Sequence, residues 1–258
     1  MKSNKALKII ITLGLVILIV ISLLLIFNRQ VKNQLIRTYQ PTVSRSSVIK
    51  NERLLDKNKH TSSKSNAGTT KQASTKKSPK MPKGVSFNFS KVKSLDVQTA
   101  VGARMNASQV RNVGQIMIPQ SGLHLPIGLG VSNTTLALAA GTMRPNQKMG
   151  EGNYPLAGHH MVNHDILFGP LYYRTKVGQS IYLTDMKYIY RYVAYQKKFI
   201  SAYHVSVINQ TKKPILTLIT CDKIGKNRLM VRGKYQAKVL LKDAPTRLKR
   251  AFEHPQYN

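Results

Sequence analysis

The chemically most informative stretch of this sequence is a strand-like run that ends in the chain's single cysteine. Ile215 to Asp222 read I-L-T-L-I-T-C-D, which predicts a strand that brings the thiol of Cys221 to its C-terminal end. After a short loop, Asn227 to Lys234 read N-R-L-M-V-R-G-K and predict a second strand, which begins near Arg228. Two antiparallel strands joined so closely place Cys221 and Arg228 at adjoining strand ends.

A histidine is predicted at the end of a third strand. Tyr154 to His160 read Y-P-L-A-G-H-H, which indicates a short strand that ends at His159 and is followed by a loop. One thiol, one imidazole and one guanidinium at three strand ends can converge on one cleft. A lone cysteine is more often a buried small hydrophobe, but the place where a sheet gives way to solvent does not suit an inert core residue.

Such a set of side chains could carry out acyl transfer. The thiolate is the nucleophilic form of cysteine and a neighbouring cation stabilises it, so Cys221 and His159 can form a reactive ion pair. His159 would protonate the leaving amine and later deprotonate the incoming amine. Arg228 offers five donors and a permanent charge to a carbonyl oxygen that becomes an oxyanion. We expect Asp222 to face the loop, because a carboxylate beside the sulfur would oppose thiolate formation.

These stretches resemble class A sortases of Gram-positive bacteria such as lactobacilli and streptococci. The similarity runs from about residue 114 to 242, and its pieces stand in the family's order: L-A-G-H, then T-L-I-T-C, then the strand led by arginine. By position, the resemblance implies that His159 is the catalytic histidine, Cys221 the nucleophile and Arg228 the essential arginine. Arg232 is the main rival of Arg228.

The resemblance also implies a substrate and a reaction. The substrate is a surface protein with a C-terminal L-P-x-T-G sorting signal, which is cleaved between Thr and Gly. The Thr acyl group is held as a thioester on Cys221 and passed to the amino group of a cell-wall precursor, lipid II. A groove for the Leu and Pro of the signal is expected near Met143, Ala157, Thr217, Ile219 and Thr220. Ordinary barrel packing explains each of these five residues almost as well when it is taken singly.

Short apolar segments separated by turn residues must position this site. The predicted strands cover residues 113–118, 123–127, 154–159, 179–184, 204–208, 215–221 and 229–235, together with a long strand that begins at residue 188 and alternates with a period of two. Residues 134–140 and 168–174 are predicted to be helical. This pattern predicts a mostly β fold, and the resemblance implies the sortase-type closed β-barrel of seven or eight strands.

The domain boundaries follow from changes in composition. We expect the barrel to occupy residues 113–243, after a partly helical lead-in segment over 85–112 and before a C-terminal tail over 244–258. Residues 28–84 predict a flexible basic stalk, because most of this segment is rich in Ser, Thr, Lys and Asn and has no apolar period that could bury a core.

An uncharged apolar run lies near the N-terminus. Residues 9–27 are dominated by Ile, Leu and Val, and at 1.5 Å per residue they reach roughly 30 Å, the thickness of a bilayer's hydrocarbon core. The run does not end in the small residues of a cleaved signal peptide, so it predicts a single transmembrane anchor in the cell membrane. We expect residues 1–8 in the cytoplasm and the catalytic domain on the extracellular side.

The formal net charge of +32 indicates an anionic setting, such as lipid head groups or phosphate-rich wall polymers. Because the excess of Lys and Arg is spread over the tail and the folded half alike, we expect no nucleic-acid partner. Two alternatives to a transpeptidase remain open. One is a cysteine hydrolase that uses water as the acceptor, and the other is a non-enzymatic, basic wall-binding anchor in which Cys221 is structural.

A metal site is not expected. His160 and His164 have the i, i+4 spacing of a helical zinc pair, but the Glu of H-E-x-x-H is missing and Gly158 and Pro155 make a poor helix start. Some class A sortases bind calcium through clustered acids, whereas the few acids of this chain's folded half are scattered among Lys and Arg. We therefore expect no metal and no other cofactor, and no calcium requirement.

Overall fold

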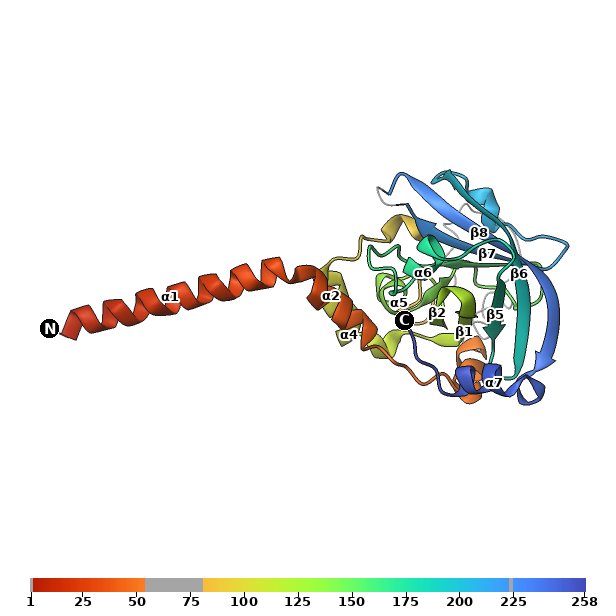
Figure 1. Cartoon of the computed structure of the whole chain (residues 1–258), viewed down its shortest axis with the longest axis horizontal. Coiled ribbons are helices and arrows are strands. Elements are labelled where there is room, and N and C mark those ends of the chain that lie inside the picture. Colours follow the sequence, from red (N-terminus) through yellow and green to blue (C-terminus); the bar gives the residue numbers. More distant parts are fainter. Residues whose placement is uncertain (1, 54–80, 223–224) are drawn as a thin grey trace, which may run out of the picture.

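The structure is a computed structural model that describes residues 2–53, 81–222 and 225–258. In these residues eight strands close into a barrel in the order β1-β2-β3-β4-β7-β8-β6-β5 (Figure 1). The strands are β1 (Asn112–Ile118), β2 (Leu123–Gly128), β3 (Ala140–Thr142), β4 (Asn153–Ala157), β5 (Ser180–Thr184), β6 (Tyr188–Ser201), β7 (Ile215–Cys221) and β8 (Asn227–Leu240). The predicted closed, mostly β barrel with short helices is confirmed.

Strand β7 and the first part of β8 are covered on both faces. Alternate side chains of a strand point to opposite faces of the sheet. On β7, Leu218 belongs to the main core, whereas its neighbour Ile219 packs in a second cluster with Met143 and Val207. On β8, Val231 and Met230 divide in the same way. The near-continuous apolar sequence of β7 therefore serves the barrel core and an outer apolar layer at once.

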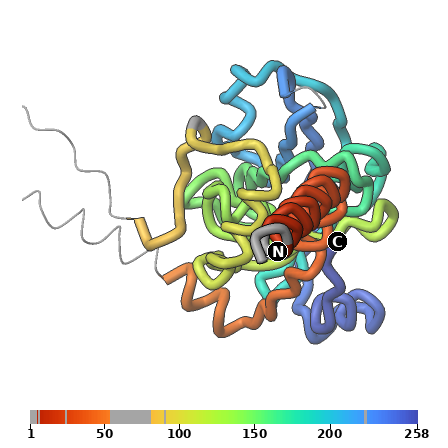
Figure 2. Tube along the Cα trace, turned by 90° about the vertical axis from the view of Figure 1, so that its left-hand side faces the viewer, coloured from red at the N-terminus to blue at the C-terminus, as the bar shows by residue number. Residues whose placement is uncertain are grey.

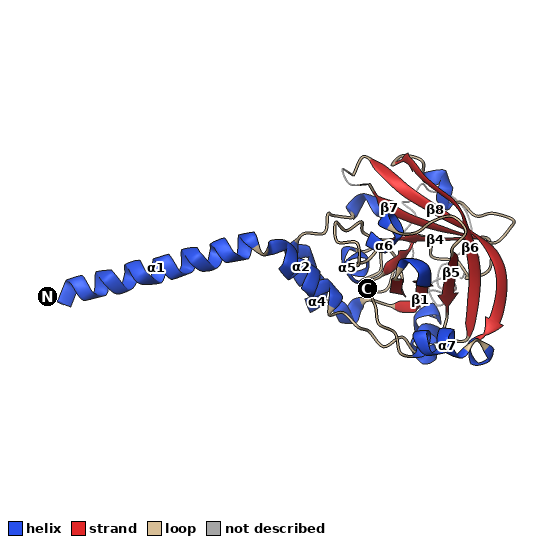
Figure 3. Ribbon diagram, in the orientation of Figure 1, coloured by secondary structure: helices blue, strands red, loops and turns tan. Residues whose placement is uncertain are grey.

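Short helices lie outside the barrel strands (Figure 3). They are α4 (Val97–Met105), α5 (Asn133–Leu138), α6 (Gly169–Tyr173) and α7 (Thr246–Glu253), with the 3-10 helices η1 (Phe89–Lys91), η2 (Ala107–Gln109), η3 (Pro119–Ser121), η4 (Val205–Ile208) and η5 (Leu241–Asp243). The carboxylate of Asp96 accepts the N–H of Thr99 at 2.7 Å and so caps α4. Ser132 caps α5 in the same manner.

The strand predicted over 204–208 is wrong, because this segment forms η4. The apolar residues Val205, Val207 and Ile208 suggested a strand, but Asn209 N–H bonds back to the Ser206 carbonyl at 3.0 Å and closes a turn. No neighbouring strand pairs with this segment among the described residues. It connects β6 to β7 as a folded loop instead.

The N-terminal part begins with α1 (Lys2–Ile26), which projects away from the barrel, and continues with α2 (Asn28–Arg37), which lies beside α4 (Figures 1 and 2). Within the described chain, no helix taken alone meets the length and hydropathy criteria for a membrane span. Leu7–Leu23 and Asn28–Arg37 meet them only as a pair, bent by 63° relative to each other.

Residues 28–53 differ from the flexible stalk predicted over 28–84. They form α2 and a helical stretch over 45–53, and Ile36, Val43 and Val48 are buried. The Asn51 amide donates to the Asn112 carbonyl at 2.8 Å and ties the stretch to β1. A few apolar residues in this polar segment are enough to hold it against the protein, because the barrel supplies the apolar surface on which they pack. Residues 54–80 of the predicted stalk lie outside the described residues.

The predicted C-terminal tail, residues 244–258, is also packed against the rest of the protein. It contains α7, whose Phe252 is fully buried, and it ends beside the N-terminal segment. The amide of Gln40 donates to the Tyr257 carbonyl at 3.1 Å, and the Tyr257 N–H donates to the Gln40 side chain at the same distance. The segment around Gln40 and the C-terminal segment therefore brace each other on one side of the barrel.

Candidate active site

The parallel pair of β4 and β7 fixes where the candidate histidine lies. Ala157 stands opposite Ile219 in the register, and the Gly158 N–H donates to the Ile219 carbonyl at 3.1 Å. Because the two strands run in the same direction, His159 leaves β4 at the level where β7 ends in Cys221. The prediction that an imidazole and the thiol meet at neighbouring strand ends agrees with this register.

The antiparallel pair of β7 and β8 places the candidate arginine. Cys221 stands directly opposite Arg228 at the open end of this pair. His159, Cys221 and Arg228 all line one cavity of about 290 Å³. Asp222 bonds to the loop, since its Oδ2 accepts the Asn227 N–H at 2.9 Å, but it also lines a second cavity together with Cys221.

The guanidinium of Arg228 is pinned by the loop that joins β7 to β8. Its Nη1 donates to the carbonyls of Gly225 at 2.9 Å and Asn227 at 3.0 Å. Nε and Nη2 are thereby left as the donors that a substrate oxygen could use. Arg232 stands opposite Thr217, four residues farther along β8, and does not line the cavity. Four residues of strand span about 14 Å, so Arg228 is the better placed of the two arginines.

His159 is 9% exposed, and its Nε2 atom is buried without a hydrogen-bond partner in the described part of the chain. Burial, with a smaller contribution from the charge of Lys32, lowers the pKa of His159 to about 4. The imidazole is therefore neutral near pH 7. This unpartnered ring nitrogen belongs to a residue that lines the same cavity as the thiol, and it is available to exchange a proton with the sulfur or with an amine.

The pKa of His124, on β2, is also lowered to about 4 by burial. We expect the free energy of unfolding to fall as the pH drops from about 6.5 towards 4, because the unfolded chain then binds protons that the folded chain does not. Each of His124 and His159 should lower the free energy of unfolding by roughly 2 kcal/mol between pH 7 and pH 5. Denaturant titrations at the two pH values measure the loss, and His159→Asn should remove about half of it. An unfolding free energy that stays constant over this range would refute the prediction.

Gly158 is required by the packing that holds His159 in place. A Cβ at this position would lie 2.7 Å from the ring of Phe168, which is fully buried. The Phe168 N–H also donates to the His159 carbonyl at 3.2 Å, so the ring cannot retreat without disturbing the histidine. We expect Gly158→Ala to lower the free energy of unfolding by about 1–3 kcal/mol.

Denaturant titration of Gly158→Ala tests this expectation. Gly102→Ala is the matched control, since its Cβ would meet no atom within 4 Å and it lies inside α4. Alanine there should stabilise the helix by up to about 1 kcal/mol. Equal free energies of unfolding for the two variants would contradict the prediction, because they would show that the Phe168 ring moves aside at little cost.

Four of the five expected groove residues line the cavity that holds Cys221, namely Met143, Ala157, Ile219 and Thr220. Thr217 does not. It is fully buried, and its hydroxyl donates to Asn153 Oδ1 at 2.8 Å, so its place is explained by packing. The rest of the cavity wall is mostly apolar and includes Val92, Leu136, Ile200, Val205, Val207 and Ile208.

Sequence reasoning missed the part of this wall that comes from η4. The Asn153 side-chain amide donates to the carbonyls of Val207 and Asn209, both at 2.9 Å, and so fastens η4 over the cavity. The run Asn209-Gln210-Thr211 is made of turn-forming and polar residues, and it could have signalled that the apolar run before it ends in a turn. The partner Asn153 lies more than fifty residues earlier, and no local pattern reveals it.

A second cavity of about 380 Å³ also reaches the candidate catalytic residues. His159 and Cys221 line it together with Arg29, Lys32 and Asn33 of α2. The sequence assigned these α2 residues to the stalk, so their position beside the thiol was not predicted. Cys221 therefore has an apolar cavity on one side and a polar, basic one on the other.

His160 and His164 are engaged by aromatic side chains. His164 stacks on Tyr173 with a centroid distance of 3.7 Å, and His160 lies 4.3 Å from the ring of Tyr172. Among the residues that the structure describes, no group of three or more His, Cys, Asp or Glu is placed to hold a metal ion.

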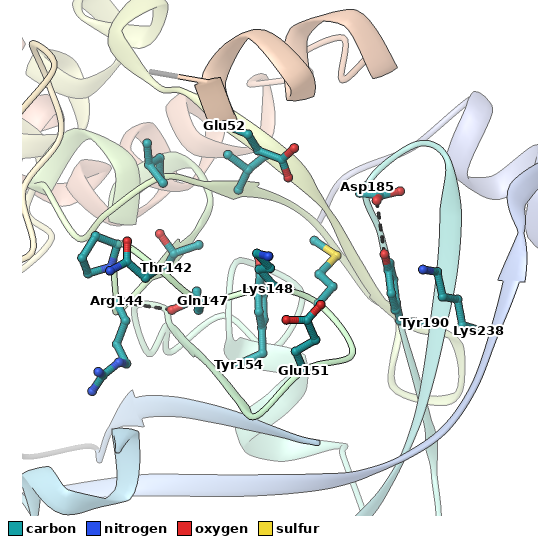
Figure 4. A pocket seen from close by; sticks show the side chains of 15 residues that line it. Glu52, Thr142, Arg144, Gln147, Lys148, Glu151, Tyr154, Asp185, Tyr190 and Lys238 are labelled. Atoms are coloured by element: carbon teal, nitrogen blue, oxygen red, sulfur yellow. Dashed lines mark hydrogen bonds between the residues drawn. The ribbon is translucent and has the colours of Figure 1, made fainter. Parts of the chain in front are cut away.

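A further cavity of about 270 Å³ shares no lining residue with the other two (Figure 4). Its lining residues carry charges of both signs, including Glu151, Lys148 and Lys238. Burial raises the pKa of Tyr190, and its hydroxyl donates to Asp185 at 3.3 Å. None of the residues that line this cavity is a cysteine or a histidine, so it contains neither Cys221 nor His159.

Comparisons with known proteins agree with this geometry. Residues 116–236 match the family described as Sortase domain. The chain is 31% identical to sortase A of Streptococcus agalactiae over 250 residues, which are 94% of this chain and 91% of the relative. It is 40% identical to sortase A of Listeria monocytogenes over 141 residues, which cover 55% of this chain and 63% of that relative, just under two thirds. The solved structure of Listeria monocytogenes sortase A aligns with a TM-score of 0.51 at 38% identity, covering 55% of this chain and 97% of that structure.

Proposed function

Because the chain belongs to the sortase family, with sortase A proteins among its relatives, we propose that it is a cysteine transpeptidase that attaches surface proteins to the cell wall. Its substrate is the C-terminal L-P-x-T-G sorting signal of such a protein, and it cleaves between Thr and Gly. The observation that carries the proposal is that His159, Cys221 and Arg228 line one cavity.

The first half of the reaction forms a thioester. The neutral imidazole of His159 first takes the proton of the Cys221 thiol, which gives a thiolate and an imidazolium. The thiolate attacks the Thr carbonyl carbon, and the carbonyl electrons move onto the oxygen, where the donors of Arg228 stabilise the negative charge. When the carbon–nitrogen bond breaks, the imidazolium of His159 gives its proton to the departing Gly amine. The Thr acyl group remains on sulfur and His159 is left neutral.

The second half reverses these roles with a different amine. The neutral imidazole of His159 takes a proton as the amine of lipid II attacks the thioester carbonyl. The carbon–sulfur bond then breaks, and the thiolate leaves as the ion pair with His159 is restored. The new amide joins the surface protein to the wall precursor, and no carboxylate, metal or cofactor takes part in either half.

The apolar cavity suits the Leu and Pro of the sorting signal. Side chains of Met143, Val207 and Ile219 form a buried cluster beside Cys221. Burying one Leu or Val side chain contributes about 1.5–3 kcal/mol, so the signal's apolar residues can place its Thr carbonyl at the sulfur.

We further propose that α1 anchors the enzyme in the cell membrane as a single span. The apolar side chains of this helix are exposed, for example Leu13 at 63% and Leu25 at 70%, and the helix projects from the barrel (Figure 1). A bilayer would cover this surface. Residues 1–8 then lie in the cytoplasm and the barrel lies outside, where anionic wall polymers meet its net positive charge.

Intact-mass spectrometry of the purified full chain with an L-P-x-T-G peptide tests the function. The expected result is an acyl adduct on Cys221 that an added amine discharges as a new peptide product. An adduct that water removes as fast with the amine as without it would identify a cysteine hydrolase. No adduct under any condition would refute the proposed chemistry.

A further inference from the structure

The thiol lies where two cavities of opposite character meet, and a transpeptidase has two substrates to place. His159 and Cys221 line both cavities. The apolar cavity is taken by the sorting signal in the function proposed above, on which the present inference rests. The second cavity gains polar and charged side chains from α2, namely Arg29, Lys32 and Asn33.

The two cations of α2 lie three residues apart and so face the same side of the helix. Lys32 is half-buried, and its Nζ donates to the Leu95 carbonyl at 3.1 Å, which fixes the ammonium at the cavity. Burial and the charge of Arg29 both lower the pKa of Lys32, which indicates electrostatic repulsion between the two cations. Like charges held together in a concave site favour an anion between them.

The nearby acids are engaged elsewhere. Asp222 lines this cavity, but its Oδ2 accepts the Asn227 N–H in the β7–β8 loop. Asp96 raises the pKa of Lys32 slightly, but its carboxylate caps α4 through the Thr99 N–H. The residues that line the cavity include two cations, Arg29 and Lys32, and one acid, Asp222, so positive charge is in excess on its wall.

We propose that this basic cavity receives the acceptor amine and that Arg29 and Lys32 bind a carboxylate carried by the same molecule. A cavity of about 380 Å³ is large enough for a short peptide, and one such peptide can place its amine near Cys221 and its carboxylate near the two cations. The acceptor is then a peptide amine with a carboxylate one or two residues away. The same cations disfavour the charged ammonium form of the amine, which cannot attack a thioester.

The test compares two acceptors that differ by one charge. Full-length enzyme is first converted to the thioester with an L-P-x-T-G peptide, and its discharge by diglycine and by diglycine amide is then followed by mass spectrometry. We expect wild-type enzyme to use diglycine about tenfold better, the contribution of one charge-assisted hydrogen bond. In Arg29→Ala/Lys32→Ala the ratio should fall to about one, whereas Lys32→Arg should retain it. Because both rates refer to one thioester, effects on its formation cancel.

Arg37→Ala is the matched control, since it removes a cation from the exposed part of α2 that does not line the cavity. Its diglycine preference should equal that of wild type. Three outcomes would overturn the proposal: wild-type enzyme without preference, a double variant that slows both acceptors equally, or a double variant that keeps the preference but loses binding to phosphatidylglycerol vesicles. The last would assign the cations to lipid head groups. If wild-type enzyme forms no thioester at all, the proposed function itself fails, and that result is distinct from the other three.

Discussion

Replacing Cys221 with alanine is expected to abolish thioester formation and to lower kcat/KM for peptide cleavage by on the order of 10⁴-fold or more. Cys221 is the single cysteine of the chain and lines both cavities, so no other thiol can take its place. Intact-mass spectrometry measures the adduct, and chromatography of the cleaved peptide measures the rate. Since Cys221 is half-buried at the end of β7, its removal should leave the fold intact, which a melting temperature close to that of wild type would show.

The same variant separates the enzyme from a non-enzymatic anchor. An anchor that holds wall polymers through its charge would retain wall binding in Cys221→Ala and would release the wall at high salt, because salt screens exposed charges. If Cys221→Ala cleaved the peptide at the wild-type rate, the thiol would be structural and the proposed chemistry would be wrong.

The parts of this fold that could be predicted are those whose signals are local. The apolar run of β7 predicts a strand from the sequence alone. Because a short loop and a second strand follow it, the sequence also predicts that Cys221 pairs with Arg228. The histidine could be placed only because the L-A-G-H stretch has the sequence of a strand end. The resemblance then supplied the family order that joined the three pieces.

The parts that could not be predicted depend on contacts between distant segments. Residues 28–53 are polar enough to pass for a stalk, yet Ile36 is buried because the barrel and α4 provide its surroundings. Segment η4 has the composition of a strand, and a side chain from β4, Asn153, folds it into a loop. The exclusion of Thr217 from the cavity follows from its hydrogen bond to the same Asn153, which sequence patterns do not show.

Arg228 offers the second large effect, and it discriminates between the two candidate arginines. We expect Arg228→Ala to lower kcat/KM for peptide cleavage by about 10²–10³-fold, the usual cost of losing an oxyanion donor. Arg228→Lys should recover only part of this loss, because an ammonium keeps the charge but lacks the planar fork that lets Nη1 hold the loop while other donors reach the substrate. Steady-state kinetics with an L-P-x-T-G peptide measures both variants.

Arg232→Ala is the matched comparison, because it removes the same side chain from the same strand about 14 Å away from Arg228. The Nε atom of Arg232 is buried, so this variant should alter the unfolding free energy more than the rate of the folded enzyme. With rates corrected for the folded fraction, Arg232→Ala should stay within a few-fold of wild type. A larger loss for Arg232→Ala than for Arg228→Ala would transfer the oxyanion role to Arg232, and it would require β8 to move along β7 when the substrate binds.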